Sequence, residues 1–297
     1  MIVIGSRGSA LALWQAKHIA GKLAEFGVET RLEIIKTTGD KIQDVPLAKV
    51  GGKGLFTKEI EEALLERKID LAVHSMKDMP TGVLEGLLIS AIPEREEPRD
   101  AMVGATLSDL KHGARIGTSS LRRASQLLAL GRGFQIENLR GNVDTRLRKL
   151  DEGQYDAIVL AAAGLRRLGW QDRIRELIPA DVMCPAVGQG ALAIETRDSG
   201  EARKIARKLD HAETRACVEA ERAMLAVLGG GCQVPIGAHA QLSGSEITLH
   251  AIVASPDGSR AIRGKLSGTN PEQVGQALGQ RLLDEGASEI LKDVYEA

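Results

Sequence analysis

The sequence predicts an α/β protein with two lobes built on mostly parallel sheets, followed by a small α+β domain with an antiparallel sheet. In the first half, short apolar runs alternate with helical patterns, which is typical of βαβ units. After about residue 212 the pattern changes to alternating strands joined by tight turns. The strand–glycine–helix pattern of residues 2–10 recurs at 115–124, and residues 66–75 resemble 152–161. Because any two βαβ units look alike, this repeat leaves open whether the lobes are truly similar.

The first lobe begins with a strand over residues 2–4 and a helix over 10–26. Gly27 ends this helix, because glycine readily adopts the left-handed conformation that closes a helix. Residues 37–54 contain five Gly or Pro residues and little periodicity, which predicts a long loop of the functional or mobile kind. The other elements predicted here are a strand over 28–36, a helix over 55–67 and a strand over 69–74.

The C-terminal domain is predicted to begin with a long helix over residues 211–228. A run of three glycines follows this helix, and a turn is expected at Pro256–Gly258. The chain closes with two helices. The predicted strands of this domain cover 238–242, 247–254 and 260–266.

Composition excludes several classes of protein. The 297 residues are 43% hydrophobic and 27% charged, which is typical of a soluble protein rather than a disordered or fibrous one. No apolar run is long enough to span a membrane, and the N-terminus lacks the basic region of a secretory signal. Three cysteines without paired spacing favour the reducing cytoplasm. A net charge of −1 and 2% aromatics argue against a nucleic-acid partner.

Arginine is concentrated in one part of the chain. Between Arg115 and Arg148 there are seven Arg, no Lys and only two acidic residues. Residues 117–123 follow a predicted strand and open a helix, where free backbone N–H groups favour anions. Residues 140–146 repeat this arrangement with Asn142 as the N-cap. Arg suits bidentate binding of carboxylate or phosphate, so the pattern predicts an anion site; the alternative is a solvated, salt-bridged helix face.

A second candidate site follows the buried strand that ends near His74, since ligands of α/β proteins bind beyond strand ends. Asp78 beside Lys77 suits a general acid or base, or a carboxylate that stabilises a cation. The alternative is a loop aspartate that forms an Asx turn before Pro80. Lys77 could instead form a Schiff base, which no other feature of the sequence supports.

Two glycine-rich segments complete the candidates. Gly51–Phe56 lacks the spacing of a nucleotide-binding loop, so a hinge or lid is the better interpretation. Gly229–Pro235 places Cys232 on a flexible turn after a helix, which leaves a reactive or an incidental thiol open. Cys184 and Cys217 do not have the spacing of a zinc site.

Seven segments in this order closely resemble the porphobilinogen deaminase (hydroxymethylbilane synthase) family, and the resemblance covers nearly the whole chain. They are GSRGSALALWQA at 5–16, KVGGKGLFTKEIE at 49–61, DLAVHSMKDMP at 70–80, IGTSSLRR at 116–123, LRGNVDTRL at 139–147, PAVGQGALAIE at 185–195 and GGCQVPIGA at 230–238.

The resemblance implies a transferase that joins four porphobilinogen molecules head to tail, each with loss of ammonia, and releases hydroxymethylbilane by hydrolysis. It implies that Cys232 carries a dipyrromethane cofactor through a thioether and that Asp78 is the catalytic acid/base, with Lys77 beside it. It implies two lobes like those of periplasmic binding proteins around a cleft, and a third domain that presents the cysteine. The implied domains are 1–93 with 190–208, 98–185 and 212–297.

Further site residues are carried over from the family motifs. Arg7, Arg140, Arg146 and Arg167 match positions expected to pair with pyrrole carboxylates, although Arg166 could replace Arg167. Val3 stands where some relatives have a basic residue, so a carboxylate contact there is doubtful. The implied cofactor-binding set is Cys232, Ser75, Lys77, Asp78, Thr118, Ser119, Ser120, Arg122, Arg123, Arg140, Arg146 and Gly164. The implied substrate-binding set is Arg7, Ser9, Phe56, Arg140, Arg146, Arg167 and Gln189.

The resemblance also implies a cytoplasmic monomer that uses no metal, nucleic acid or membrane. The alternative function is a two-lobed module that binds a small anion without catalysis. Such a module would use the arginine-rich turns but would not need Cys232 or Asp78.

Overall fold

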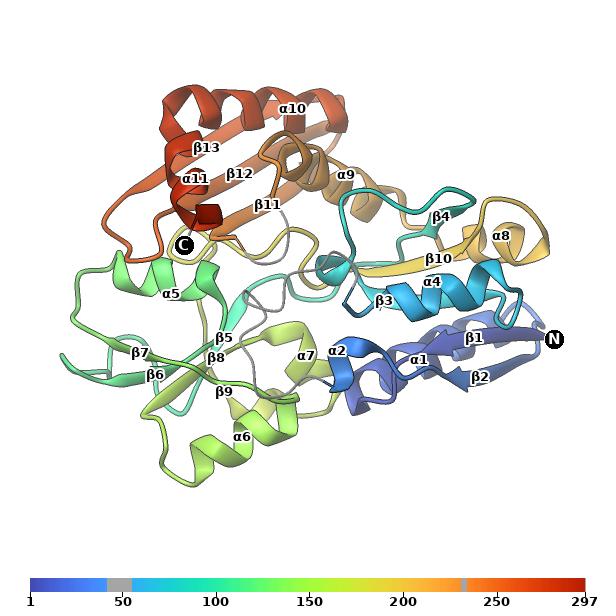
Figure 1. The fold of residues 1–297 in the computed structure, drawn as a ribbon, viewed down its shortest axis with the longest axis horizontal. Coiled ribbons are helices and arrows are strands. Elements are labelled where there is room, and N and C mark those ends of the chain that lie inside the picture. The colour runs from blue at the N-terminus through green and yellow to red at the C-terminus, as the bar shows by residue number, and fades with distance from the viewer. Residues whose placement is uncertain (42–54, 231–233, 297) are drawn as a thin grey trace. The chain divides into compact units, whose positions relative to one another are not determined.

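The structure, a computed structural model, describes residues 1–41, 55–230 and 234–296 (Figure 1). The predicted loop over 37–54 and Cys232 therefore lie largely or wholly outside the described residues. None of the helices in the described ranges combines the length and apolar character needed to cross a bilayer. The chain divides into two compact units of two segments each, Met1–Glu96 with Ala191–Arg215 and Glu97–Gly190 with Ala216–Ala297.

The first unit is built on sheet A, which has the strand order β2-β1-β3-β10-β4. Strand β1 pairs in parallel with β2 and β3, whereas β10 runs antiparallel to β3 and β4. Four strands therefore run in one direction and β10 runs in the opposite direction. The sheet is thus mixed, with two parallel and two antiparallel strand pairs. The strands are β1 (Ile2–Ser6), β2 (Thr30–Ile34), β3 (Leu71–Ser75), β4 (Leu87–Ala91) and β10 (Leu192–Arg197).

Helices cover both faces of sheet A because alternate residues of its strands are buried on opposite sides. Leu71 and Val73 pack with Ile19 of α1 and Ala206 of α8, whereas Ala72 packs with Leu64 of α4. The helical elements of this unit are α1 (Ala10–Ala24), α2 (Thr38–Lys41), α4 (Lys58–Leu65), α8 (Glu201–Ala206) and the 3₁₀ turns η1 (Met76–Asp78) and η3 (Arg207–Leu209).

The second unit contains sheet B, whose order β7-β6-β8-β5-β9 parallels that of sheet A. Strand β6 pairs in parallel with β7 and β8, and β5 runs antiparallel to β8 and β9. Its strands are β5 (Asp100–Val103), β6 (Arg115–Gly117), β7 (Gln135–Glu137), β8 (Ala157–Ala161) and β9 (Ile174–Leu177). Its helical elements are α5 (Leu121–Leu128), α6 (Val143–Asp151), α7 (Ala162–Arg167) and η2 (Gln171–Arg173).

The predicted repeat is confirmed at the level of single hydrogen bonds. In sheet A, Asp70 accepts a hydrogen bond from the backbone N–H of Val3 through Oδ2 (2.9 Å) and donates its own N–H to the Val3 carbonyl (2.8 Å). In sheet B, Asp156 does the same with Arg115, at 2.7 and 2.9 Å. The aspartate before each central strand therefore fixes the start of the neighbouring strand in the same way.

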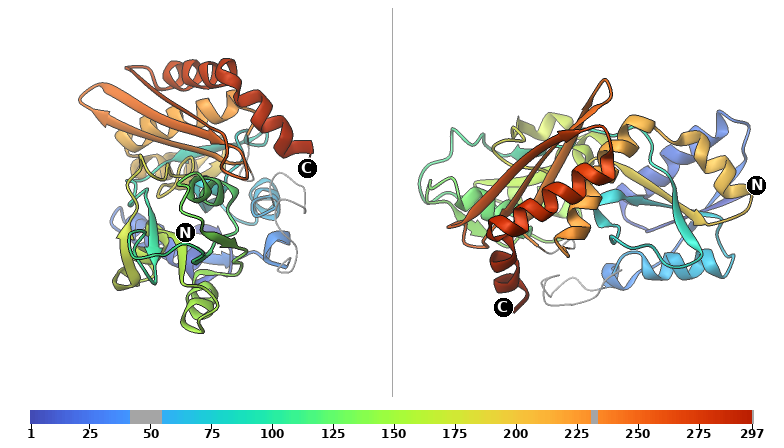
Figure 2. Two further views of the ribbon diagram at one scale, coloured as in Figure 1. Left: turned by 90° about the vertical axis from the view of Figure 1, so that its left-hand side faces the viewer. Right: turned by 90° about the horizontal axis from the view of Figure 1, so that it is seen from above.

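The second unit also contains sheet C, an antiparallel meander of order β11-β12-β13. Figures 1 and 2 show α10 lying along one face of this sheet, where Leu278 and Leu282 pack on Leu249 and Val253. The elements are α9 (Ala212–Val227), whose residues 212–215 are assigned to the first unit, β11 (Ile236–Ser243), β12 (Glu246–Ala254), β13 (Ala261–Gly268), α10 (Pro271–Leu282), the π-turn η4 (Leu283–Ala287) and α11 (Ser288–Glu296). This confirms the predicted α+β region.

Candidate active site

In the first unit, the predicted catalytic residues lie on the 3₁₀ turn η1 directly after β3. Two buried methionines fix this turn, because Met76 is 1% exposed and Met79 is 3% exposed. The N–H of Met76 donates to the carbonyl of Ala191, which joins the turn to the chain entering β10 (3.0 Å). Lys77 and Asp78, between the two methionines, are therefore held half-buried at the end of the sheet.

The side chain of Asp78 accepts no hydrogen bond from any residue in the described part of the chain, so the alternative of an Asx turn before Pro80 finds no support. A half-buried carboxylate without a protein partner can accept or donate a proton to a bound ligand. Ser75 at the end of β3 accepts a hydrogen bond from Nε2 of Gln15 on α1 (2.9 Å). The predicted catalytic residues thus stand on a segment anchored to two neighbouring elements.

The predicted substrate-binding residues of this unit follow β1 and precede α4. The guanidinium carbon of Arg7 lies 4.1 Å from the centroid of the Phe56 ring, which is a cation–π contact. The stacking limits the orientations that Arg7 adopts. Ser9 is the N-cap of α1, where its Oγ accepts from the N–H of Ala12 (3.3 Å). This interaction leaves the hydroxyl proton of Ser9 free to donate.

Behind the turn, three titratable side chains are buried in the first unit. Nε2 of His74 lies 3.0 Å from Oε2 of Glu195 on β10, and Glu61 of α4 is 4% exposed. Burial, and then the charge of Glu195, raise the pKa of Glu61 above its ordinary value. His74 immediately precedes Ser75, so this buried group supports the strand that carries η1 and the predicted catalytic residues.

In the second unit, the predicted anion-binding residues surround the start of α5. Oγ1 of Thr118 accepts the N–H of Ser120 (3.2 Å), which shapes the turn between β6 and the helix. Ser120 is the N-cap, but its side chain makes no capping hydrogen bond. Ser119 is exposed, and its hydroxyl has no partner among the described residues. The turn therefore presents hydroxyl groups at the positive end of a helix dipole.

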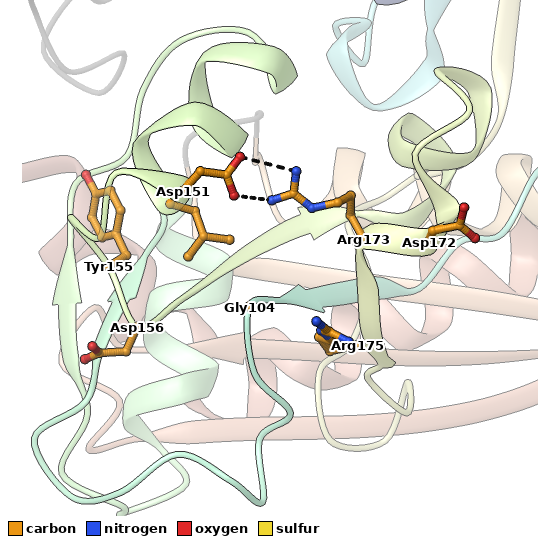
Figure 3. A pocket seen from close by; sticks show the side chains of 8 residues that line it. Gly104, Asp151, Tyr155, Asp156, Asp172, Arg173 and Arg175 are labelled. Atoms are coloured by element: carbon orange, nitrogen blue, oxygen red, sulfur yellow. Dashed lines mark hydrogen bonds and ion pairs between the residues drawn. The ribbon is translucent and has the colours of Figure 1, made fainter.

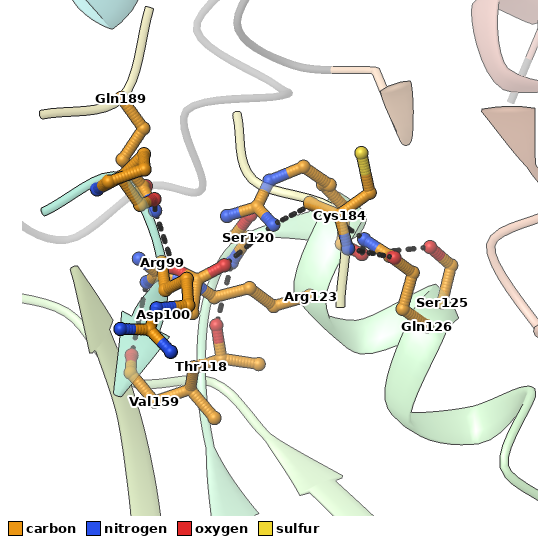
Figure 4. Close-up of polar contacts among 12 residues, drawn as sticks. Arg99, Asp100, Thr118, Ser120, Arg123, Ser125, Gln126, Val159, Cys184 and Gln189 are labelled. Atoms are coloured by element: carbon orange, nitrogen blue, oxygen red, sulfur yellow. Dashed lines mark hydrogen bonds and ion pairs between the residues drawn. The ribbon is translucent and has the colours of Figure 1, made fainter. Parts of the chain in front are cut away.

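The two arginines of α5 are buried instead of extended into solvent, and Figure 4 shows Arg123 with Asp100 and Val159. Arg122 is 4% exposed and Arg123 is 6% exposed, and both pair with Asp100 on β5. Arg122 also donates to the carbonyl of Cys184 (2.6 Å), and Arg123 donates to the carbonyl of Val159 (3.0 Å). The alternative of a solvated arginine face is therefore wrong for these two residues.

Gln189 and Arg167 are also buried in the second unit. Nε2 of Gln189 donates to Oδ1 of Asp100 (3.0 Å) and to the carbonyl of Pro98 (2.7 Å). Nη2 of Arg167, at the end of α7, donates to the carbonyl of Gly190 (2.6 Å). Arg166 is 40% exposed and pairs with Glu97 at 3.6 Å, so the two neighbouring arginines have different environments. Gly164 is buried in the middle of α7.

Arg140 and Arg146 lie at the start of α6, on the turn that joins it to β7. Nε of Arg146 donates to the carbonyl of Gly141 (2.8 Å), and both arginine side chains are half-buried. Asn142 occupies the predicted N-cap position, although its side chain makes no capping hydrogen bond. Arg140 and Arg146 therefore place two guanidinium groups at a helix N-terminus, a position that favours anions.

The three cysteines and the glycine-rich segment Gly51–Phe56 complete the predicted candidates. Cys232 and most of Gly51–Phe56 lie outside the described residues. Cys184 and Cys217 are buried free thiols, and burial raises the pKa of Cys184 to about 12, so it is poorly reactive. Among the described residues no group of His, Cys, Asp and Glu could hold a metal ion.

Sequence reasoning missed Asp100 and Glu195. Asp100 follows the charged run 94–99, so in the sequence it resembles another solvated acidic residue. The feature that could have indicated its burial is the apolar segment Ala-Met-Val directly after it. Glu195 is an acid inside the apolar strand LAIET. A single charge within a buried strand indicates a partner elsewhere in the fold, but the sequence does not identify that partner.

A pocket of about 300 Å³ lies elsewhere in the second unit (Figure 3). It is lined by Tyr155, Asp156 and the ion pair between Asp151 and Arg173 (2.5 Å). None of the predicted site residues lines it. The pocket therefore contributes nothing to the candidate site.

Comparison with known proteins decides the family. Residues 2–205 match the family model "Porphobilinogen deaminase, dipyromethane cofactor binding domain", and residues 215–284 match "Porphobilinogen deaminase, C-terminal domain". The chain belongs to the porphobilinogen deaminase family. A porphobilinogen deaminase from Syntrophobacter fumaroxidans is 53% identical and covers 100% of this chain and 99% of its own. The porphobilinogen deaminase of Geobacter sulfurreducens is 52% identical and covers 99% of this chain and 94% of its own. That of Nitratidesulfovibrio vulgaris strain DP4 is 55% identical and covers 99% of this chain and 96% of its own.

Solved structures resembling this porphobilinogen deaminase family member include proteins of transport systems. A periplasmic substrate-binding protein of an ABC transporter from Coxiella burnetii has a TM-score of 0.43 and 14% identity, and covers 74% of this chain and 95% of its own. The unliganded L-cystine solute receptor of Neisseria gonorrhoeae has a TM-score of 0.41 and 13% identity, with coverages of 78% and 94%.

Proposed function

We propose that this chain catalyses the stepwise condensation of four porphobilinogen molecules onto a covalently bound dipyrromethane primer. Each addition releases ammonia, and hydrolysis then releases hydroxymethylbilane. The observation that carries the proposal is the match of both family domains along nearly the whole chain, together with relatives of the same name that align from end to end.

Cys232 is the proposed attachment point of the cofactor, which when bound supplies the carbon nucleophile for the first addition. The proposed cofactor-binding residues of the second unit are chemically suited to it, because the carboxylates of its pyrrole rings require cations and N–H or O–H donors. The start of α5 offers the Ser119 hydroxyl, and Arg122 and Arg123 lie in the first turn of the helix. Arg140 and Arg146 place two further positive charges at the start of α6.

Asp78 is the proposed general acid and base. Its carboxyl group donates a proton to the amine of porphobilinogen, so that the C–N bond breaks and ammonia leaves. The carboxylate left behind stabilises the resulting azafulvenium cation, and after the new C–C bond forms it takes up the proton released from the ring carbon. The lack of a protein partner for Asp78 in the described residues supports this role, because the carboxyl group can face the substrate.

The remaining proposed contacts are assigned to the substrate. Arg7 and Arg167 bind the acetate or propionate groups of porphobilinogen, and Phe56 orients Arg7 through their cation–π contact. Lys77 lies beside Asp78 and supplies a positive charge to the same carboxylates. Ser9, Gln189, Arg140 and Arg146 complete the proposed substrate set.

We also propose the domain limits 1–93 with 190–208, 98–185 and 212–297, which the three separate sheets support. A cytoplasmic monomer is proposed as well. The buried free thiols of Cys184 and Cys217 support a reducing compartment. Size-exclusion chromatography with light scattering tests the monomer, and a dimer at micromolar concentration would contradict it.

Incubation of the purified protein with porphobilinogen tests the function directly. We expect four porphobilinogen molecules consumed and four ammonia molecules released for each linear tetrapyrrole formed. Binding of porphobilinogen without ammonia release would instead identify the chain as a small-anion-binding module. Activity that survives Cys232→Ser but is lost in Lys77→Met would identify a Schiff-base enzyme.

A further inference from the structure

Asp100 is a fully buried carboxylate at the centre of the second unit's polar cluster (Figure 4). It is the first residue of β5, and its side chain is 0% exposed. Its Oδ2 accepts a hydrogen bond from Nη1 of Arg122 at 2.7 Å. Its Oδ1 accepts from Nε of Arg123 and from Nε2 of Gln189, each at 3.0 Å. One carboxylate therefore joins three residues that the family resemblance assigns to the ligand.

The protonation state of Asp100 follows from these contacts. Burial alone would raise the pKa of this carboxyl group, but the charges of Arg122 and Arg123 outweigh burial and hold the pKa well below its usual range. Asp100 is therefore ionised throughout the neutral pH range. The cluster of two guanidinium groups and one carboxylate has a net charge of +1, which a single ligand carboxylate neutralises.

Each guanidinium group is held at two points. Arg122 donates from Nη1 to Asp100 and to the carbonyl of Cys184, and Arg123 is held by Asp100 and the carbonyl of Val159. Within the described residues, Nε and Nη2 of Arg122 donate no hydrogen bond. Arg122 thus has its orientation fixed on one edge while its other donors remain available.

We propose that Asp100 is a positioning residue that fixes the orientation of Arg122 and Arg123 and neutralises one of their two charges before a carboxylate of the cofactor binds. Preorganised donors bind a ligand more tightly than donors that must first be ordered. The inference rests on the proposed function, because it takes the bound carboxylate to be that of the dipyrromethane.

The test measures the fraction of protein that carries the cofactor, by intact mass, for Asp100→Asn, Asp100→Glu, Arg123→Met and the double variant of Asp100→Asn with Arg123→Met. Asn removes the charge at constant size and turns an N–H₂ group toward one of the arginines. We expect the loaded fraction of folded Asp100→Asn to fall about tenfold or more, the effect of losing one charge-assisted hydrogen bond. Asp100→Glu keeps the charge and should restore most of the loading.

The double variant separates positioning from an independent effect and guards against misfolding. It has the same net charge of +1 as the wild-type cluster, so it should fold even where Asp100→Asn does not. If Asp100 acts through the arginines, the two losses are not independent. The loaded fraction of the double variant should then be at least as high as that of the single variant with the lower loaded fraction. A loss equal to the product of the two single losses would overturn the proposal. So would a folded Asp100→Asn that loads like the wild type.

Asp156→Asn is the matched control, since Asp156 also pairs with an arginine in the same sheet but does not contact the cluster. Its loading should equal that of the wild type at a temperature where all variants are folded. The two proposals fail in different ways. Normal loading in Arg123→Met and Arg122→Met would remove the arginines from the proposed function, whereas reduced loading in these with normal loading in Asp100→Asn would overturn only the role of Asp100.

Discussion

At the scale of single residues, burial separates the charged side chains into two classes. Asp78 is half-buried and has no side-chain partner in the described ranges, whereas Asp100 is fully buried and bonded to three side chains. The first arrangement leaves the carboxyl group able to contact a ligand, and the second holds neighbouring side chains in place. Both residues are aspartates next to a strand end, so the sequence alone does not tell these roles apart.

Asp78→Asn should therefore lower turnover and leave stability nearly unchanged. We expect kcat to fall by about a hundredfold or more, because the amide neither donates nor accepts the proton in catalysis. Thermal unfolding should match the wild type, since no hydrogen bond to the described chain is lost. Glu85→Gln, an exposed carboxylate in the same unit, is the control and should be fully active. Turnover of Asp78→Asn within twofold of wild type would remove this residue from the mechanism.

Glu61 predicts a pH dependence of stability. Burial first, and the charge of Glu195 second, raise the pKa of Glu61 in the folded protein above its unfolded value. The folded state therefore binds this proton more tightly, so the stabilisation is present below the unfolded pKa and is lost as pH rises through the folded pKa. His74, Thr57 and Glu62 also face or flank this group and contribute to its pKa.

The measurement is urea unfolding at several pH values between about 5 and 8. The wild type should lose stability relative to Glu61→Gln as pH rises, because the glutamine carries no titrating proton. Glu85→Gln is the control, since Glu85 is exposed in the same unit and is not among the groups that shift the pKa of Glu61. Parallel curves for wild type and Glu61→Gln would contradict the raised pKa.

At the scale of elements, the turn between β12 and β13 of sheet C packs against α5, the helix that carries Arg122 and Arg123. Gly258 has φ of +72°, and a Cβ there would lie 2.6 Å from the backbone nitrogen of Ala129 and 2.7 Å from the carbonyl of Ser125. These atoms belong to the C-terminal end of α5 and its cap. Only glycine allows so close an approach, so α5 is packed between sheet B and this turn.

Gly258→Ala should therefore destabilise the protein through two effects. The positive φ costs about 1 kcal/mol, and the contact with backbone atoms adds about 1–3 kcal/mol of overpacking. Gly244→Ala is the matched control, because Gly244 has φ of +60° in another hairpin of sheet C but no atom within 4 Å of its added Cβ. Equal free energies of unfolding for the two variants would show that the turn does not press on α5.

The sequence predicted those helices and strands in which the spacing of the apolar residues is regular. The helix from Ala10, the strand ending at Ser75 and the hairpins of sheet C were expected close to their observed limits. Strands β5 and β10 were not predicted, because each pairs with a strand that is far away in the sequence. Strand β5 pairs with β8 in sheet B, and β10 pairs with β3 in sheet A. The burial of Arg122 and Arg123 was missed for the same reason, since their partner Asp100 lies more than twenty residues away.

At the scale of the whole molecule, each unit has candidate residues after the second and third strands in the order of its sheet, which are β1 and β3 in sheet A and β6 and β8 in sheet B. Asp70 and Asp156 fix the two sheets alike, yet the following turns differ. The first unit's turns carry Arg7, Lys77 and Asp78, and the second unit's carry donors without an acid/base pair. We therefore expect the same sheet topology to carry the proposed acid/base turn in one unit and the proposed anion-binding turns in the other.

If a cysteine-linked dipyrromethane primes the reaction, the purified protein carries it, and its intact mass detects it. We predict a mass above that of the 297-residue chain by two linked pyrrole units, and an unmodified mass in Cys232→Ser. Cys217→Ser is the control and should retain the added mass, because this thiol is buried. A wild-type protein that is active at its unmodified mass, or an added mass that persists in Cys232→Ser, would contradict the account.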